Sequence, residues 1–143
     1  MRALLDVNVL IALLDAGHLH HRRATSWMGA HLRHGWASCP LTQNGCIRIM
    51  AQPGYSNPAP AAQVAQRLAE AAGDASHEFW PDDVSLLEPG RVDWSHVLGA
   101  RQVTDAYLLS LAVAHDGRFV TFDRGVPLPG VAGAQRRHLV TLD

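Results

Sequence analysis

Three aspartates stand in similar local settings far apart in the chain. Asp6 and Asp123 each follow an apolar, strand-forming run, and Asp105 lies beside Thr104 at the start of an apolar helical run. In an open α/β sheet, ligands bind beyond the carboxyl ends of the strands and beside helix N-termini. Three carboxylates gathered there repel each other unless a cation lies between them. We therefore expect Asp6, Asp105 and Asp123 to share one metal site.

Each acid also has a structural interpretation. Asp6 suits the N-cap of the helix that follows it, and Thr104 as an N-cap would place Asp105 in a first helical turn, where its charge suits the helix dipole. Asp123 lies in Asp-Arg-Gly, a turn-forming sequence. Only the joint placement of the three acids favours a shared cation site.

The ligand types at these positions indicate which metal to expect. No His or Cys occurs at the three points, and an oxygen-only set favours Mg²⁺ or Mn²⁺ over zinc. Mg²⁺ usually binds through one or two carboxylates together with substrate phosphates. A cation at such a site activates solvent and neutralises charge on phosphorus. Hydrolysis of a phosphate ester is therefore the expected chemistry.

The elements that must position these acids alternate along the chain. Hydrophobic periodicity predicts strands at 3–5, 36–39, 77–80, 118–122 and 138–142, and helices at 8–14, 18–34, 41–50, 59–72, 94–100 and 104–114. Thr42 is the expected N-cap of helix 41–50, and Pro81-Asp82-Asp83 is expected to start a short helix. This alternation predicts an α/β fold, a three-layer α/β/α sandwich around a mainly parallel sheet, as a single domain over 1–143.

Composition describes an ordinary globular chain. Its 143 residues are 48% hydrophobic and 17% charged with a net charge of −1, so no overall basic balance points to nucleic acid, although all 12 basic residues are Arg. Cys39 and Cys46 lack CxxC spacing and are expected to be reduced. Asp6 and Asn8 interrupt the apolar N-terminal run, so we expect a cytoplasmic protein with no membrane association.

Five segments resemble a known family in their order and spacing. They are Leu-Asp-Val-Asn-Val-Leu-Ile at 5–11, Leu-Thr-Gln-Asn-Gly-Cys-Ile-Arg at 41–48, Phe-Trp-Pro-Asp-Asp at 79–83, Gln-Val-Thr-Asp-Ala-Tyr-Leu-Leu at 102–109 and Thr-Phe-Asp-Arg-Gly at 121–125. Together they resemble the PIN-domain ribonucleases, and more narrowly the VapC toxins of type II toxin–antitoxin operons.

The resemblance implies a function. It implies a PIN-like fold and a Mg²⁺-dependent endoribonuclease that cleaves structured RNA, such as a tRNA or rRNA loop. It also implies a homodimer that is neutralised by a cognate antitoxin whose C-terminal tail fills the acidic groove. An Arg on that tail would satisfy clustered carboxylates as a metal does. Asp6, Asp105 and Asp123 occupy the family's acidic positions.

One departure concerns Gln43. The family has a Glu two residues after the Leu that begins segment 41–48, and this chain has Gln43 there. Gln offers a carbonyl oxygen but no charge, and metal affinity depends on ligand charge. If Gln43 is a catalytic residue, we expect a one-metal or high-Mg²⁺ enzyme that is slower than Glu-bearing relatives. If the family Glu only tunes the local charge, its loss matters little.

Several further residues are candidates for supporting roles. Around the acids they are Asn8, Thr42, Arg48 and Thr121: Asn8 to orient Asp6, Thr42 first as a helix cap, Arg48 to pair with a carboxylate, and Thr121 because it faces the side of Asp123. His21, Arg22 and Arg23 lie in the densest cationic cluster and are candidates for RNA-phosphate contacts. The alternative for that cluster is a solvated helix face.

Two other functions remain open at this level. A haloacid-dehalogenase-like phosphatase would use Asp6-Val7-Asn8 as an approximate Asp-x-Asp motif, but Asn8 cannot donate a proton and the chain has no Lys to hold a phosphoryl group. The other alternative is a binding module on the PIN fold, weakened through Gln43, that binds RNA or an antitoxin without cleavage.

Overall fold

A five-stranded sheet forms the centre of the computed structural model, which describes residues 1–143. The strands are β1 (Ala3–Leu5), β2 (Trp36–Ser38), β3 (His77–Phe79), β4 (Arg118–Thr121) and β5 (Leu139–Thr141). Their order is β3-β2-β1-β4-β5, and every neighbouring pair is parallel. All carboxyl ends therefore lie at one edge of the sheet, as the sequence predicts. Each strand agrees with its predicted range to within one residue at either end.

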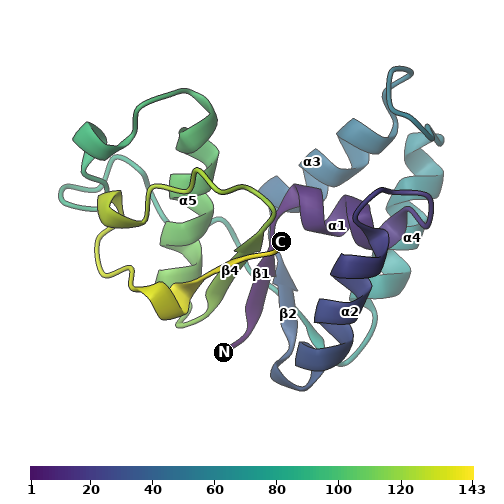
Figure 1. The fold of residues 1–143 in the computed structure, drawn as a ribbon, viewed down its shortest axis with the longest axis horizontal. Helices are drawn as coiled ribbons and strands as arrows, with labels where there is room; N and C mark the ends of the chain where they lie inside the picture. The colour runs from purple at the N-terminus through teal and green to yellow at the C-terminus, as the bar shows by residue number, and fades with distance from the viewer.

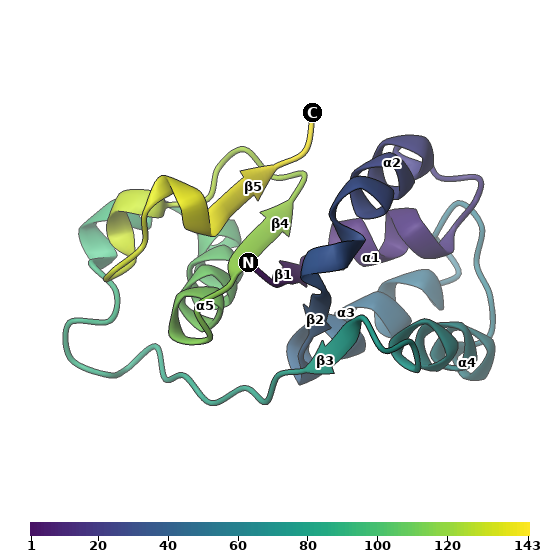
Figure 2. The ribbon, with the colours of Figure 1, turned by 90° about the horizontal axis from the view of Figure 1, so that it is seen from below.

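Helices cover both faces of this sheet. They are α1 (Val7–Leu14), α2 (His21–His31), α3 (Pro40–Met50), α4 (Ala61–Ala72) and α5 (Arg101–Ala114). Figure 1 shows α1 to α4 on one side of the strands and α5 on the other. Figure 2 shows the long irregular segment between β3 and α5 passing around the sheet to reach the α5 side. The predicted three-layer α/β/α arrangement is confirmed.

The alternation of side chains along β1 explains the two faces. Leu5 packs into a cluster with residues of α1, α3 and α4, whereas Leu4 packs into a second cluster with residues of α5. Both leucines are fully buried, and burying each contributes about 1.5–3 kcal/mol. Because both faces of the central strand are covered, it has no polar side chain until Asp6, where the sheet ends.

The starts of α2 and α3 differ from the prediction. Helix α2 begins at His21 rather than at 18, and a 3₁₀ turn over Leu32–His34 ends at Gly35, whose φ of 77° favours glycine. Helix α3 begins at Pro40 with Cys39 as its N-cap. Thr42 is therefore not the N-cap: from the third helical position its Oγ1 accepts a bond from the Cys39 N–H at 3.0 Å.

The start of α5 and the segment before it also differ. Helix α5 begins at Arg101, so Asp105 lies in its second turn and Thr104 caps nothing. Pro81-Asp82-Asp83 starts no helix, and only a 3₁₀ turn over Trp94–His96 forms before α5. The Asp83 carboxylate instead lies 3.0 Å from Nε2 of His115 at the end of α5. The Asp83 carboxylate therefore pairs with the end of α5 and does not cap a helix of its own segment.

None of the helices combines the length and the apolar character that crossing a lipid bilayer requires. Cys39 and Cys46 are buried free thiols, as expected.

Candidate metal centre

Asp6 lies at the junction of β1 and α1, where it serves both the fold and the candidate site. Its Oδ1 accepts the Val7 N–H at 2.7 Å as the N-cap of α1, and its own N–H donates to the Val120 carbonyl of β4 at 2.9 Å. The carboxyl is buried, and this burial raises its pKa. Hydrogen bonds from Thr121 and Val7 oppose the rise, and the charge of Asp123 adds to it.

Thr121 links Asp6 to the other side of the site. At the end of β4, its hydroxyl donates to Asp6 Oδ2 at 2.6 Å and accepts the Asp123 N–H at 3.0 Å. Asn8 adds two contacts: its Nδ2 donates to Thr121 Oγ1 at 3.4 Å, and its Oδ1 accepts the Phe122 N–H at 3.3 Å. Thr121 and Asn8 therefore position the β4 end against α1.

Asp105 brings a carboxyl from the opposite layer. It is 6% exposed on α5, and its Oδ2 is buried with no hydrogen-bond partner. Burial raises the pKa of Asp105 to about 7, helped by the nearby carboxyl of Asp123 and by the charge of Asp6. Arg101, one helical turn earlier, lowers it. A buried carboxyl oxygen without a partner costs free energy, which a cation would recover.

Asp123 begins the loop after β4. Its Oδ1 accepts the Gly125 N–H at 2.8 Å, so the turn role that its sequence suggests is also fulfilled. The loop is held to α5 by Gln102, whose Nε2 donates to the Gly125 carbonyl at 2.7 Å while its Oε1 accepts the Leu98 N–H at 2.6 Å. Gln102 is a positioning residue that sequence patterns do not reveal, because both of its partners are backbone groups.

The three acids thus interact electrostatically at one edge of the sheet. No group of three or more His, Cys, Asp or Glu side chains is close enough to hold a metal ion by itself. Mg²⁺ usually takes one or two protein carboxylates and completes its shell with water. The oxygen-only donors and the unpartnered Asp105 Oδ2 fit such a hard divalent cation.

Gln43 of α3 hydrogen-bonds to Ser38 at the end of β2. Its Nε2 donates to Ser38 Oγ at 2.9 Å, and Ser38 Oγ lies 2.8 Å from His77 Nε2. Burial lowers the pKa of His77, and a hydrogen bond to the Ala72 backbone opposes this. Gln43 also borders a hollow of about 170 Å³ between α3 and α4. The Gln43 side chain is thus one of three polar side chains, with Ser38 and His77, that contact one another in series.

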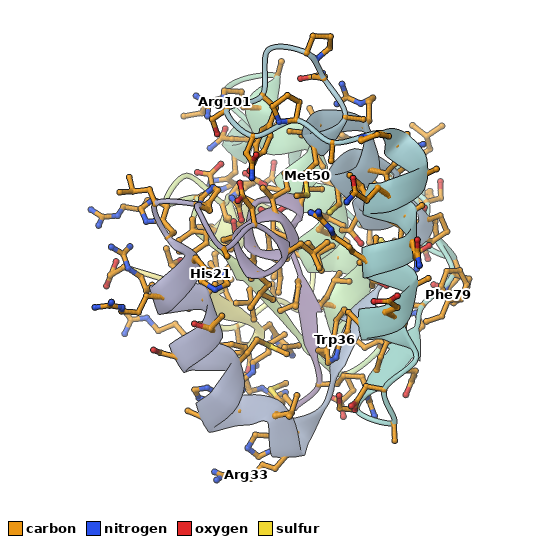
Figure 3. All side chains as sticks on the ribbon, turned by 90° about the vertical axis from the view of Figure 1, so that its right-hand side faces the viewer. His21, Arg33, Trp36, Met50, Phe79 and Arg101 are labelled. Carbon is orange, nitrogen blue, oxygen red and sulfur yellow. The ribbon has the colours of Figure 1, made fainter.

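The remaining predicted residues divide into surface and structural ones. Arg48 is exposed on α3 and pairs with no carboxylate, contrary to the prediction, because its side chain points to solvent. His21 is turned inward, with Nδ1 2.7 Å from the Ala12 carbonyl, so it ties α2 to α1. Arg22 and Arg23 are exposed on the first turn of α2. Figure 3 shows His21 where α2 begins and Arg101 at the end of the molecule from which α5 starts.

The largest hollow lies elsewhere. It measures about 350 Å³ and is lined mainly by apolar side chains of α1, α2 and α4, among them Leu14, Met28 and Leu68, with Glu70 and Asp74 on its border. Asp6, Asp105 and Asp123 do not line it, so this hollow is separate from the candidate metal centre.

Comparisons with known proteins identify the family. The PIN domain family model matches residues 3–131. Ribonuclease VapC44 of Mycobacterium tuberculosis is 53% identical over 142 residues, which cover 99% of this chain and 100% of that protein. Ribonuclease VapC39 of the same organism is 42% identical over 135 residues, covering 93% and 96%.

Two solved structures share the fold at low sequence identity. VapBC2 from Rickettsia felis, bound to a DNA fragment from its promoter, matches with a TM-score of 0.58 and 10% identity over 100% of both chains. PAE2754 from Pyrobaculum aerophilum matches with a TM-score of 0.58 and 20% identity, over 94% of this chain and 82% of the other. From the family match and the full-length relatives together, this chain belongs to the PIN-domain family and, within it, to the VapC proteins.

Proposed function

We propose that this protein is a metal-dependent endoribonuclease, the toxin of a type II toxin–antitoxin pair, in which Mg²⁺, with Mn²⁺ as a substitute, binds through one or two of the Asp6, Asp105 and Asp123 carboxylates and completes its shell with water. One observation carries the proposal: Asp105 keeps a buried, unpartnered carboxyl oxygen beside two further carboxyls at the sheet edge. Such a carboxyl is costly unless a ligand uses it. The relatives named as VapC ribonucleases support the choice of RNA.

The chain's own residues divide the work. A divalent cation held here supplies Lewis-acid stabilisation and activates solvent for attack on a phosphodiester. Thr121 and the Val7 N–H fix the Asp6 carboxyl, while Asn8 and Gln102 fix the backbone on either side of Asp123. Exposed Arg101, whose charge acts on Asp105, is available to an RNA phosphate at the entrance.

A cognate antitoxin is the proposed protein partner. An Arg from its tail would occupy the acidic centre in place of a cation and so block the reaction. The apolar hollow bordered by Glu70 and Asp74 supports this part of the proposal, because an amphipathic segment with apolar and basic side chains would cover it. An RNA loop of tRNA or rRNA is the proposed substrate.

The test is cleavage of total RNA by purified protein with Mg²⁺, with Mn²⁺ and with EDTA. We expect cleavage that EDTA abolishes and that Asp105→Asn lowers at least 100-fold, an ordinary loss for a group that stabilises the reacting charge. Asp93→Asn is the matched control, because Asp93 is an exposed aspartate outside the site. It should cleave like the unchanged protein.

Other results would identify the alternatives. RNA binding without cleavage in any metal would favour the binding module, to which the contact of Gln43 with Ser38 lends some support. Release of phosphate from small phosphoesters would favour the phosphatase, against which stands the engagement of Asn8 with Thr121 and Phe122.

A further inference from the structure

A stack of rings and a guanidinium lies where β4 ends, and its members come from three segments of the chain. Phe122 follows β4, His18 and His20 lie in the connection between α1 and α2, and Arg23 lies in the first turn of α2. We propose that Phe122, His20 and Arg23 form a platform that binds an unpaired nucleobase of the RNA next to the bond to be cut. This inference rests on the proposed ribonuclease function.

The position of Phe122 relative to the acids is fixed by the backbone. Its neighbours in sequence are Thr121, which hydrogen-bonds to Asp6, and Asp123. Its own N–H donates to Asn8 Oδ1 at 3.3 Å. Because consecutive Cα atoms are about 3.8 Å apart, Phe122 and the Asp123 that follows it both lie where β4 ends.

The rings already stack on one another. The His20 ring lies 4.8 Å from the Phe122 ring, centroid to centroid, with 26° between the planes. His18 adds a tilted ring 5.7 Å from that of His20. The His20 N–H donates to His18 Nδ1 at 3.0 Å, and the turn before it is fixed by the Gly17 N–H donating to Asp15 Oδ1 at 3.0 Å. Binding a base therefore requires little new ordering of this loop.

Exposure and charge leave the stack open to a nucleotide. His20 and Phe122 are half-buried residues, so part of each is exposed to solvent. The Arg23 guanidinium lies 6.0 Å from the Phe122 centroid, within the range of a cation–π contact. Arg22 beside it is exposed as well. Stacked rings flanked by arginines are the means by which proteins hold unpaired bases and the phosphates that follow them.

The occupant is therefore single-stranded RNA. A base within a duplex is already stacked and has no free face to offer, whereas a base in a loop has one. Stacking is tolerant of base identity because every base has a π-face. The platform would select unpaired over paired RNA and would not by itself read sequence.

The experiment measures RNA binding separately from cleavage. A single-stranded RNA oligonucleotide containing 2-aminopurine is titrated with the full protein in EDTA, where the proposed reaction is off. We expect quenching of the 2-aminopurine fluorescence and a Kd that Phe122→Leu raises about tenfold, which corresponds to the loss of one stacked base. Phe122→Tyr keeps an aromatic ring and should bind RNA like the unchanged protein. Its binding would also show that a substitution at position 122 does not by itself disrupt the fold.

The matched control is Phe79→Leu. Phe79 is 52% exposed on β3, and Figure 3 shows it on the opposite side of the molecule from His21. This variant loses an exposed ring of the same kind and should bind RNA like the unchanged protein. A duplex of the same sequence should show no difference between Phe122→Leu and the unchanged protein.

A KM and kcat comparison in Mg²⁺ separates the two proposals. The platform predicts that Phe122→Leu raises KM about tenfold for a single-stranded substrate. Cleavage with equal KM and equal Kd in Phe122→Leu and the unchanged protein would overturn the platform while leaving the nuclease intact. A different outcome is that the unchanged protein quenches 2-aminopurine fluorescence, Phe122→Leu does not, and the unchanged protein cleaves no RNA. That outcome would support the platform and contradict the nuclease. No binding of single-stranded RNA would overturn the platform directly.

Discussion

At the scale of single residues, Asp105 shows a conflict between stability and the proposed function. Its carboxyl is buried, one oxygen has no partner, and its pKa is raised to about 7. Burial is the main cause, and the neighbouring Asp123 and Asp6 add to it. A residue selected for folding alone would not be an acid here. The arrangement is expected where a site must be ready for a cation.

We predict that Asp105→Asn stabilises the metal-free protein at neutral pH while it abolishes cleavage. The folded-state pKa lies above the unfolded value, so between 3.8 and about 7 the folded state binds more protons than the unfolded state. The free energy of unfolding of the unchanged protein therefore falls as pH rises through that window. At pH 7.5 the variant should be more stable by about 1–2 kcal/mol, after discounting for solvent screening.

Thermal unfolding in EDTA between pH 4.5 and pH 8 checks this prediction. The difference between the two proteins should grow with pH and level off above the folded-state pKa. A difference that stays constant with pH would show that Asp105 titrates normally.

Gln43 is the residue at which the sequence and the structure suggest different roles. The family pattern makes it a neutral substitute for a metal-site Glu, whereas its side chain hydrogen-bonds to Ser38. We predict that Gln43→Glu lowers the Mg²⁺ concentration for half-maximal cleavage several-fold, because a carboxylate adds negative charge at the carboxyl edge of the sheet. The measurement is the cleavage rate across a Mg²⁺ titration.

Asn44→Asp provides the control for charge alone. Asn44 is the next residue of α3 and is exposed, so the same charge is added toward solvent. If both variants shift the Mg²⁺ requirement equally, or neither does, residue 43 has no special access to the cation and acts through Ser38.

At the scale of elements, the crossing of α1 and α3 determines where Asp6 can lie. Gly45 of α3 packs directly against Val7 at the start of α1: a Cβ at Gly45 would lie 2.7 Å from Val7 Cγ2. Val7 is also the residue whose N–H donates to the Asp6 carboxylate, the N-cap of α1. The close approach of the two helices therefore positions the first acid as well as the core.

We predict that Gly45→Ala lowers the free energy of unfolding by about 1–3 kcal/mol, because the added methyl overpacks this crossing. Gly29→Ala is the matched control. A Cβ at Gly29 meets nothing within 4 Å, and Gly29 lies inside α2, so the same substitution should stabilise the protein by up to about 1 kcal/mol. Urea denaturation of both variants measures the two effects. Equal effects of the two substitutions would show that the α1–α3 distance is not set by Gly45.

The local hydrophobic pattern predicts the presence of helices and strands more accurately than it predicts the residues at which they begin and end. The apolar runs of β1 and of α5 are evident in the sequence because they are continuous. The helix starts were harder to predict. Thr104 has the chemistry of a cap, but α5 begins three residues earlier, where Gln102 joins the segment before the helix to the Asp123 loop. Such a long-range contact leaves no local signal.

At the scale of the whole molecule, the candidate centre joins two layers of the sandwich. Asp6 and Asp123 follow strands β1 and β4, while Asp105 comes from α5, which packs on the opposite face from α1 (Figure 1). A cation held by Asp105 together with Asp6 or Asp123 would link α5 to the sheet edge. It would thus add to global stability by binding only the folded state.

We predict that Mg²⁺ raises the thermal unfolding midpoint and that EDTA reverses the rise. A concentration 100 times the dissociation constant should add about 2.7 kcal/mol to the free energy of unfolding. The gain should vanish in Asp105→Asn and persist in Asp93→Asn. A midpoint that is indifferent to Mg²⁺ and to Mn²⁺ in the unchanged protein would contradict a cation site formed by these acids.

Local sequence by itself determined the parallel sheet, the alternation of layers and the end of the sheet at which the acids follow their strands. These features depend on hydrophobic period and on residue types that no packing detail changes. Tertiary structure alone decided which acids interact, that Gln43 bonds to Ser38, and that Phe122 stacks on His20 beside Arg23. Those facts depend on side-chain directions across elements, which are fixed only when the helices pack on the sheet.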